Sequence, residues 1–135
     1  MKQLIKTLKI TTKGQGFYEF TSEIVKHVNK IKNGLLTIYV KHTSCSLLIQ
    51  ENADSDVQKD LLNFFSKTIP EDGNYIHQSE GSDDMPAHIK SALTQTSLSI
   101  PIENFEITLG TWQGIYLFEH RKSSHTRTIK LHLID

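Results

Sequence analysis

The chain has 135 residues, of which 37% are hydrophobic and 22% charged. This length and composition predict a folded protein with a single domain over residues 1–135. Lysine plus arginine and aspartate plus glutamate both number 15, so nucleic-acid binding is not expected. No apolar segment is long enough to cross a bilayer, and membrane association is not expected either. The single cysteine, Cys45, excludes an internal disulfide and favours a cytoplasmic setting.

Three helices are predicted from apolar residues at helical spacing. The first begins at Thr21, whose side chain should cap it, and ends before Asn33. The second covers residues 54–69, and the third begins near Pro86, which suits the first turn of a helix. Each helix has an apolar stripe, so each needs a surface to pack against.

Strands dominate the end of the sequence. Residues 13–16, which contain two glycines, are expected to be flexible. The order of elements favours an α+β fold in which an antiparallel or mixed sheet has about three helices packed on one side. The strands are predicted at residues 4–10, 35–41, 46–50, 98–102, 106–109, 114–120 and 127–134.

The densest group of side chains able to handle protons or metals lies between residues 75 and 88. Gly81 allows the backbone to turn tightly there, so these groups can converge. Because His88 follows Asp84 by one helical turn, the carboxylate can orient the imidazole for metal binding. A solvated acidic loop with a half-buried structural histidine is the alternative. The group contains His77, Glu80, Asp83, Asp84 and His88.

A second group closes the strand predicted at residues 114–120. Glu119 and His120 are consecutive, so their side chains point to opposite faces of the strand, and one of them shares a face with apolar residues. A charge on that face is costly unless it is paired or ligated. Arg121 can hold a phosphate or carboxylate through two parallel N–H bonds, or it can form a surface salt bridge.

Small polar residues follow the strand predicted at residues 35–41. His42, Thr43 and Ser44 can bind an anion through hydroxyl and backbone N–H groups, although similar turns are common without a ligand. Cys45 is a poor candidate for a nucleophile, because only His42 stands nearby to lower its pKa. Glycine-rich nucleotide loops, paired-cysteine zinc motifs and a nucleophile elbow are absent.

Five segments together resemble the YjbQ-like proteins, also described as secondary thiamine-phosphate synthases. The resemblance extends over nearly the whole chain, and the order of several long motifs makes it specific. Cys45 stands where a smaller residue is more usual, and Phe105 replaces a typical turn glycine. The segments are HTSCSL (42–47), ENAD (51–54), EGSDDMPAHIK (80–90), IPI (100–102) and LGTWQGIYLFEHR (109–121).

The resemblance implies an α+β domain, usually assembled as a homotrimer, in which histidines and acidic residues hold a metal ion. Matched by motif, the histidines are His77, His88 and His120. The resemblance also implies a weak thiamine-phosphate synthase activity, which joins a pyrimidine pyrophosphate to a thiazole phosphate.

The leading hypothesis is a metal-dependent enzyme acting on a small phosphorylated molecule, with Zn²⁺ or Mg²⁺ bound by the three histidines. Glu80, Asp83 and Asp84 would orient the ligands, and Arg121 would offset charge on a leaving pyrophosphate. A non-enzymatic module that binds phosphorylated metabolites or metal, and a purely structural trimer, are the alternatives. Substrate contacts are expected from the matched residues His42, Thr43, Ser44, Glu51, Thr111, Gln113 and Glu119.

Overall fold

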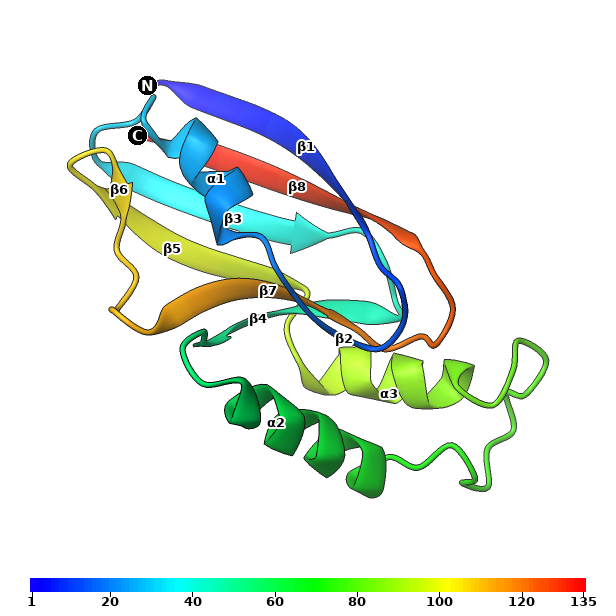
Figure 1. Ribbon diagram of the computed structural model, residues 1–135. Coiled ribbons are helices and arrows are strands. Elements are labelled where there is room, and N and C mark those ends of the chain that lie inside the picture. Colours follow the sequence, from blue (N-terminus) through cyan, green and yellow to red (C-terminus); the bar gives the residue numbers. More distant parts are fainter.

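The computed structural model describes all residues from 1 to 135 and shows two antiparallel sheets (Figure 1). The larger sheet has the strand order β1-β8-β3-β5-β6, and the smaller has the order β2-β7-β4. The strands are β1 (Gln3–Thr11), β2 (Gly16–Glu19), β3 (Gly34–Val40), β4 (Cys45–Glu51), β5 (Ser97–Glu103), β6 (Glu106–Ile107), β7 (Gln113–Glu119) and β8 (Thr126–Ile134).

The apolar core lies between the two sheets. Strand β8 alternates buried and half-buried residues, as expected for a strand with one face against a core. Its residues Ile129, Leu131 and Leu133 belong to one buried cluster with Leu47 of β4 and Leu117 of β7. Because both sheets contribute to this cluster, their facing surfaces form a single core.

The first helix, α1 (Thr21–Val28), contacts β6 of the larger sheet and β7 of the smaller one. Its buried residues Ile24 and Val28 belong to the core cluster. Thr21 does not cap this helix: its hydroxyl donates to Glu19 Oε2 at 2.9 Å and accepts the backbone N–H of Ile115 at 2.8 Å. The hydroxyl therefore ties the helix start to β7.

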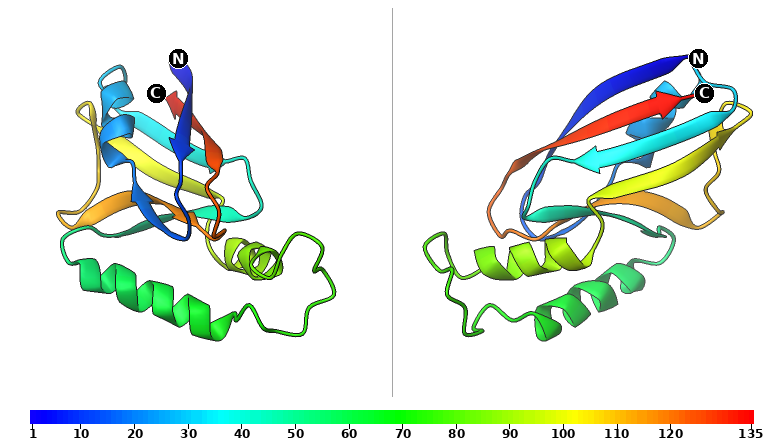
Figure 2. Two further views of the ribbon diagram at one scale, coloured as in Figure 1. Left: turned by 45° about the vertical axis from the view of Figure 1, so that its right-hand side comes forward. Right: turned by 180° about the vertical axis from the view of Figure 1, so that it is seen from behind.

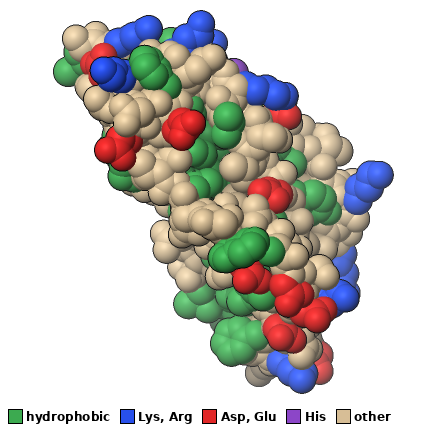
Figure 3. All heavy atoms as spheres, turned by 60° about the vertical axis from the view of Figure 1, so that its left-hand side comes forward, with side chains coloured by type: hydrophobic (Ala, Val, Ile, Leu, Met, Phe, Trp, Pro, Cys, Tyr) green, Lys and Arg blue, Asp and Glu red, His purple; other side chains and the backbone are tan.

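The other two helices, α2 (Ser55–Thr68) and α3 (Asp84–Leu93), lie below the smaller sheet, on the side away from the larger one (Figure 2). Asp54 caps α2 by accepting the backbone N–H of Asp56. No residue of α2 is fully buried, whereas five residues of α3 are. In Figure 3, hydrophobic side chains lie exposed among acidic ones in the lower part of the molecule, where these helices are.

The predicted α+β class is confirmed, with three helices on antiparallel sheets. One difference is that the strands form two sheets, so that α1 contacts both of them while α2 and α3 cover one. Another is β2, which begins at Gly16, the last residue of the stretch predicted to be flexible, and pairs with β7. No helix is long and apolar enough to span a membrane.

Candidate functional site

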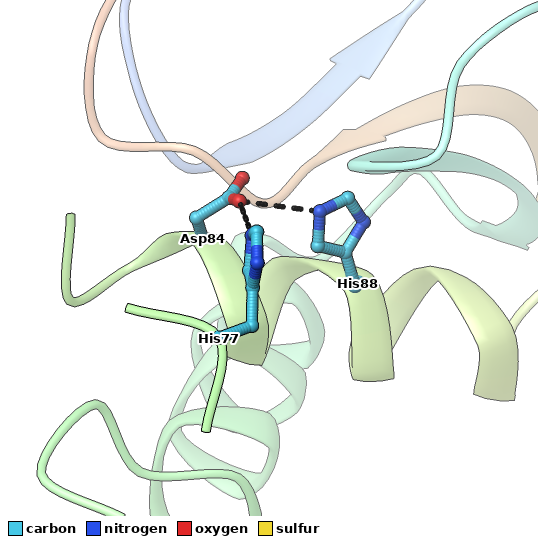
Figure 4. A group of neighbouring side chains, drawn as sticks. All are labelled: His77, Asp84 and His88. Carbon is cyan, nitrogen blue, oxygen red and sulfur yellow. Dashed lines mark hydrogen bonds and ion pairs between the residues drawn. The ribbon is translucent and has the colours of Figure 1, made fainter. Parts of the chain in front are cut away.

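Asp84, His77 and His88 form a compact cluster at the start of α3 (Figure 4). Asp84 Oδ2 lies 2.7 Å from His77 Nε2 and 3.2 Å from His88 Nε2. One ligand atom from each residue lies within 4.8 Å of the other two. Asp84 is buried, His88 is partly buried and His77 is exposed, so the cluster is open to solvent on the side of His77.

Local backbone structure explains how these residues meet. Asp84 and His88 are separated by one turn of α3, which places both side chains on the same face of the helix. His77 comes from the segment between α2 and α3. The chain turns back toward the helix at Gly81, whose φ of +105° is accessible to glycine at little cost. The predicted convergence of residues 77, 84 and 88 therefore depends on helical spacing and one glycine turn.

A backbone contact fixes the proton position on His88. Its Nδ1 lies 2.9 Å from the carbonyl oxygen of Thr43, and a carbonyl can only accept, so Nδ1 carries a proton. In a neutral ring the Nε2 lone pair then faces Asp84 Oδ2. Only a proton or a cation between these two acceptors makes the contact favourable. Nδ1–H bonded to a backbone carbonyl is also the usual support for a histidine that binds metal through Nε2.

Arg121 forms hydrogen bonds with the two neighbouring carboxylates, Asp83 and Asp84. Its Nη1 donates to Asp84 Oδ1 at 2.7 Å, and its Nε donates to Asp83 Oδ2 at 3.0 Å. Burial opposes ionisation of Asp84, but hydrogen bonding by His77 and the charges of Arg121 and His88 outweigh it and lower the pKa. Asp83 is affected in the same way: burial is outweighed by the Lys122 N–H and Arg121, and its pKa is lowered. Both carboxylates are therefore ionised at neutral pH.

Glu80 contributes to this arrangement through its backbone. Its carbonyl oxygen accepts a hydrogen bond from Arg121 Nη2 at 3.0 Å, and no hydrogen bond to its carboxylate is present. Arg121 thus uses three of its five N–H groups on Glu80, Asp83 and Asp84. Two N–H groups stay free for another acceptor.

His120, the third histidine predicted to bind metal, is not a member of this cluster. Its Nε2 lies 2.9 Å from Ser46 Oγ, and its side chain is 1% exposed. Burial, followed by the charges of Lys90 and Arg127, lowers the pKa of His120 to about 3, so the ring is neutral at pH 7. The helices cover the face of β7 that carries Phe118 and His120, and that is why this strand end is buried.

Glu119 lies on the opposite face of β7 and is fully buried. Its carboxylate accepts two hydrogen bonds from Arg127, from Nε at 2.8 Å and from Nη2 at 2.5 Å, and one from Thr12 Oγ1 at 2.7 Å. Burial of Glu119 is outweighed by the hydrogen bonds from Arg127 and Thr12, which lower its pKa. The carboxylate of Glu119 is therefore paired with Arg127 inside the protein.

The predicted substrate residues that follow β3 form hydrogen bonds with other residues of the chain. His42 Nε2 accepts the backbone N–H of Thr128 at 2.8 Å, and Arg127 Nη2 donates to Ser44 Oγ at 3.0 Å. The backbone carbonyl of Thr43 accepts the hydrogen bond that orients His88, so this turn helps to position one residue of the cluster. Burial raises the pKa of the neighbouring Cys45 thiol to about 12, in keeping with a non-nucleophilic cysteine.

The remaining predicted substrate residues lie at the other end of the smaller sheet. Glu51 pairs with Gln113, six positions along the strands from the pairing of Cys45 with Glu119. Six residues of strand span roughly 20 Å. Thr111 lies in the turn just before β7. The fold therefore does not bring these residues beside the histidines.

No functional role is predicted from the sequence for Lys90 or Arg127, and Ser46 is predicted only as one of the small polar residues after His42. All three side chains are buried. Lys90 lies on α3, Ser46 on β4 and Arg127 on β8. Arg127 has one detectable signal: it shares the inward row of β8 with Ile129 and Leu131, where a charge requires a buried partner. Lys90 has no such signal. The third helix has only ten residues, so the spacing of its apolar residues does not show which of its polar side chains are buried.

Comparisons with known proteins agree with this arrangement of elements. The family described as "UPF0047 protein YjbQ-like" matches residues 6–135. A UPF0047 protein of Synechocystis is 52% identical over 136 residues, covering 98% of this chain and 92% of the relative. YjbQ of Escherichia coli O157:H7 is 45% identical over 92% of both chains.

Solved structures show the same fold. The crystal structure of a yjbq/upf0047 family protein from Clostridium acetobutylicum superposes with a TM-score of 0.86 at 34% identity, covering 97% of this chain and 99% of that one. A conserved hypothetical protein from Thermus thermophilus gives a TM-score of 0.87 at 30% identity, covering 96% and 99% of the two chains.

Proposed function

Because the chain belongs to the UPF0047 family of YjbQ-like proteins, we propose that it is a metal-dependent enzyme acting on small phosphorylated molecules. The proposed ligands are His77, Asp84 and His88, in place of the three histidines expected from sequence. The supporting observation is their mutual approach to within 4.8 Å. A single ion bound between these atoms would join the loop that carries His77 to α3.

The chemistry of the donor set indicates the kind of metal. Two imidazole nitrogens and one carboxylate oxygen suit Zn²⁺ or a similar transition-metal ion, whereas Mg²⁺ prefers oxygen ligands. Three protein ligands leave coordination positions for water or substrate. When bound, such an ion supplies Lewis-acid stabilisation of negative charge on a phosphate oxygen.

The chain's own residues prepare the site in two ways. Arg121 orients Asp84 and holds it ionised, and the Thr43 carbonyl keeps the Nε2 of His88 free to accept. The two unused N–H groups of Arg121 can bind a phosphate oxygen of the substrate. Arg121 is therefore proposed to position both a ligand and the substrate.

Histidines of the cluster line hollows at the protein surface. His77 lines an open hollow of about 720 Å³ with Tyr75, Ile76 and Met85. His88 lines a smaller one of about 230 Å³ beside Thr43. A substrate in either hollow would have a histidine of the cluster in its wall. The larger hollow has room for a substrate of metabolite size.

The first measurement is the metal content of the purified protein by elemental analysis. We expect about one equivalent of a transition metal per chain, and its loss in His77→Ala, His88→Ala and Asp84→Asn. His132→Ala is the matched control, because His132 is paired with Gln3 on the far sheet and should keep the metal. His120→Ala should also keep it. Stoichiometric metal in all three cluster variants would reject the site.

The second measurement addresses the reaction. The metal-loaded protein is incubated with the pyrimidine pyrophosphate and thiazole phosphate of the thiamine-phosphate synthase reaction, and thiamine phosphate is followed by chromatography. Product above background that disappears in Asp84→Asn supports this transferase activity. Saturable binding of either compound without product would instead support a binding module.

A further inference from the structure

A separate cavity of about 300 Å³ lies between α2, α3 and the end of β7. None of His77, Asp84 and His88 lines it. Its volume is at the lower end of the range for small-molecule sites. The metal cluster therefore does not explain why polar and charged residues line this cavity.

A buried cation faces this cavity. Lys90 is 6% exposed, and its ammonium group forms no hydrogen bond or ion pair within the chain. The carboxylates that influence it from a distance have other partners: Glu71 pairs with Lys122, and Asp83 pairs with Arg121. Lys90 as a whole is nearly inaccessible, but its ammonium nitrogen is not closed off, so an anion that enters the cavity would meet a cation without a partner.

A buried imidazole lines the same cavity with one nitrogen unused. His120 Nδ1 is inaccessible and has no hydrogen-bond partner, while Nε2 is held by Ser46. Buried polar atoms are nearly always satisfied, and an exception calls for an explanation. Because solvent does not reach Nδ1, this nitrogen does not face the open space, and other atoms of the ring line the cavity.

The wall formed by α2 adds polar and aromatic groups. Asn63 and Ser66, one helical turn apart, line the cavity with side chains that form no hydrogen bond within the chain. Between them is Phe65, whose ring lies edge-on to Phe118 at 5.3 Å. The cavity thus offers hydrogen-bonding groups beside one cation and an apolar wall. Glu119 also lines it, but its carboxylate is paired with Arg127.

We propose that this cavity is a second binding site, which takes a small organic phosphate with its anionic group beside Lys90. Asn63 and Ser66 donate to the phosphate oxygens, and the apolar part of the ligand lies against Phe65 and Phe118. The site is separate from the metal cluster. Lys90 follows His88 by two residues, which is about 200° around a helix of 3.6 residues per turn, so the two side chains point from opposite faces of α3.

The test is titration calorimetry with phenyl phosphate, which combines a phosphate with one aromatic ring, and with inorganic phosphate for comparison. Wild-type protein is measured as purified and again after metal removal with a chelator. Lys90→Met removes the buried charge and keeps the length of the side chain. Lys67→Met is the matched control, since Lys67 is an exposed lysine of α2 that does not line the cavity.

We expect saturable binding of phenyl phosphate, at least tenfold weaker in Lys90→Met and within twofold of wild type in Lys67→Met. Chelation, or replacement of both His77 and His88 with alanine, should leave this binding unchanged, which separates the result from the metal proposal. No saturable binding by wild type, or equal affinity in Lys90→Met, would overturn the inference. Loss of binding on replacing only the two histidines would place the phosphate at the metal cluster instead.

A second variant covers the case in which Lys90→Met fails to fold. Ser66→Trp places a large ring at the mouth of the cavity from an exposed position of α2, where the helix itself should tolerate it. With the circular dichroism spectrum unchanged, phenyl phosphate binding should be lost. Binding at wild-type strength in this folded variant would also contradict the proposal.

Discussion

The guanidinium of Arg121 donates from Nη1 to Asp84 Oδ1 at 2.7 Å, on the carboxylate oxygen that does not face the histidines. Asp84 therefore has one oxygen fixed by a cation and the other directed at two imidazoles. Arg121 follows β7, whereas Asp84 begins α3, so the contact connects the smaller sheet to the helix layer. The geometry of the cluster depends on this connection.

Replacement of Arg121 with methionine should weaken metal binding without removing a ligand. Loss of an outer partner of this kind typically reduces metal affinity about 10- to 100-fold. Competition between the protein and a chromogenic chelator for Zn²⁺ measures the effect. Lys122→Met removes a charge from the next residue, whose side chain pairs with Glu71, and should change the affinity by less than threefold. Unchanged affinity in Arg121→Met would show that Asp84 needs no such support.

The buried pair of Glu119 and Arg127 should dominate the effect of single substitutions on stability. Glu119→Gln leaves the guanidinium of Arg127 without its counter-ion in an interior where both side chains are nearly inaccessible. We expect the unfolding free energy from urea denaturation to fall by about 3 kcal/mol. The double variant Glu119→Gln with Arg127→Met should recover part of that loss.

An exposed pair gives the comparison for this prediction. Lys26 and Glu23 are one helical turn apart on α1, and their side chains are 63% and 52% exposed. Glu23→Gln should change the unfolding free energy by less than about 0.5 kcal/mol. A similar small change for Glu119→Gln would mean that water reaches Arg127 in solution.

The sequence predicted much of this structure because most elements have a clear apolar period. The pairing of Asp84 with His88 followed from helical spacing, and Gly81 indicated where the intervening loop could turn. The short strand β2 was missed because four residues next to glycines carry too little pattern. The division of the strands between two sheets depends on long-range pairing, which local periodicity does not record.

His120 shows why a strand end is difficult to interpret from sequence. Alternation placed Glu119 and His120 on opposite faces and predicted that one of them would be buried among apolar residues. Both are buried, because the larger sheet covers one face of β7 and the helices cover the other. A local pattern identifies the two faces of a strand, but it does not say how many of them are covered.

Neutral burial of His120 should make stability depend on pH below neutrality. Burial and the neighbouring charges lower its pKa to about 3 in the folded chain, whereas an exposed histidine has a pKa of about 6.5. Between these values the unfolded chain binds the proton and the folded chain does not. The contribution is therefore fully present above pH 6.5 and is lost as the pH falls toward 3, with a slope approaching about 1.4 kcal/mol per pH unit.

The measurement is urea denaturation at pH 7.0, 6.0 and 5.0 for wild type and His120→Asn. The substitution removes the titrating group, so the difference in unfolding free energy between the two proteins should shrink steadily as the pH falls. Parallel pH profiles would mean that His120 is protonated about equally in both states. His132→Asn, which changes a partly exposed histidine on β8, is the control for the substitution itself.

The hairpin between β5 and β6 should be more stable with glycine at Phe105. Asn104 and Phe105 have φ angles of 51° and 68°, a left-handed conformation that asparagine and glycine adopt at a lower cost than phenylalanine. A left-handed residue other than glycine costs about 1–2 kcal/mol, and the Phe105 ring is about half exposed. Phe105→Gly should raise the thermal midpoint by about 3 °C in differential scanning calorimetry. Asn104→Gly should change it little, because asparagine already suits the turn. A fall in the midpoint of Phe105→Gly would show that the ring, which lines a surface hollow with Val25 and Val28 of α1, contributes more than the backbone strain costs.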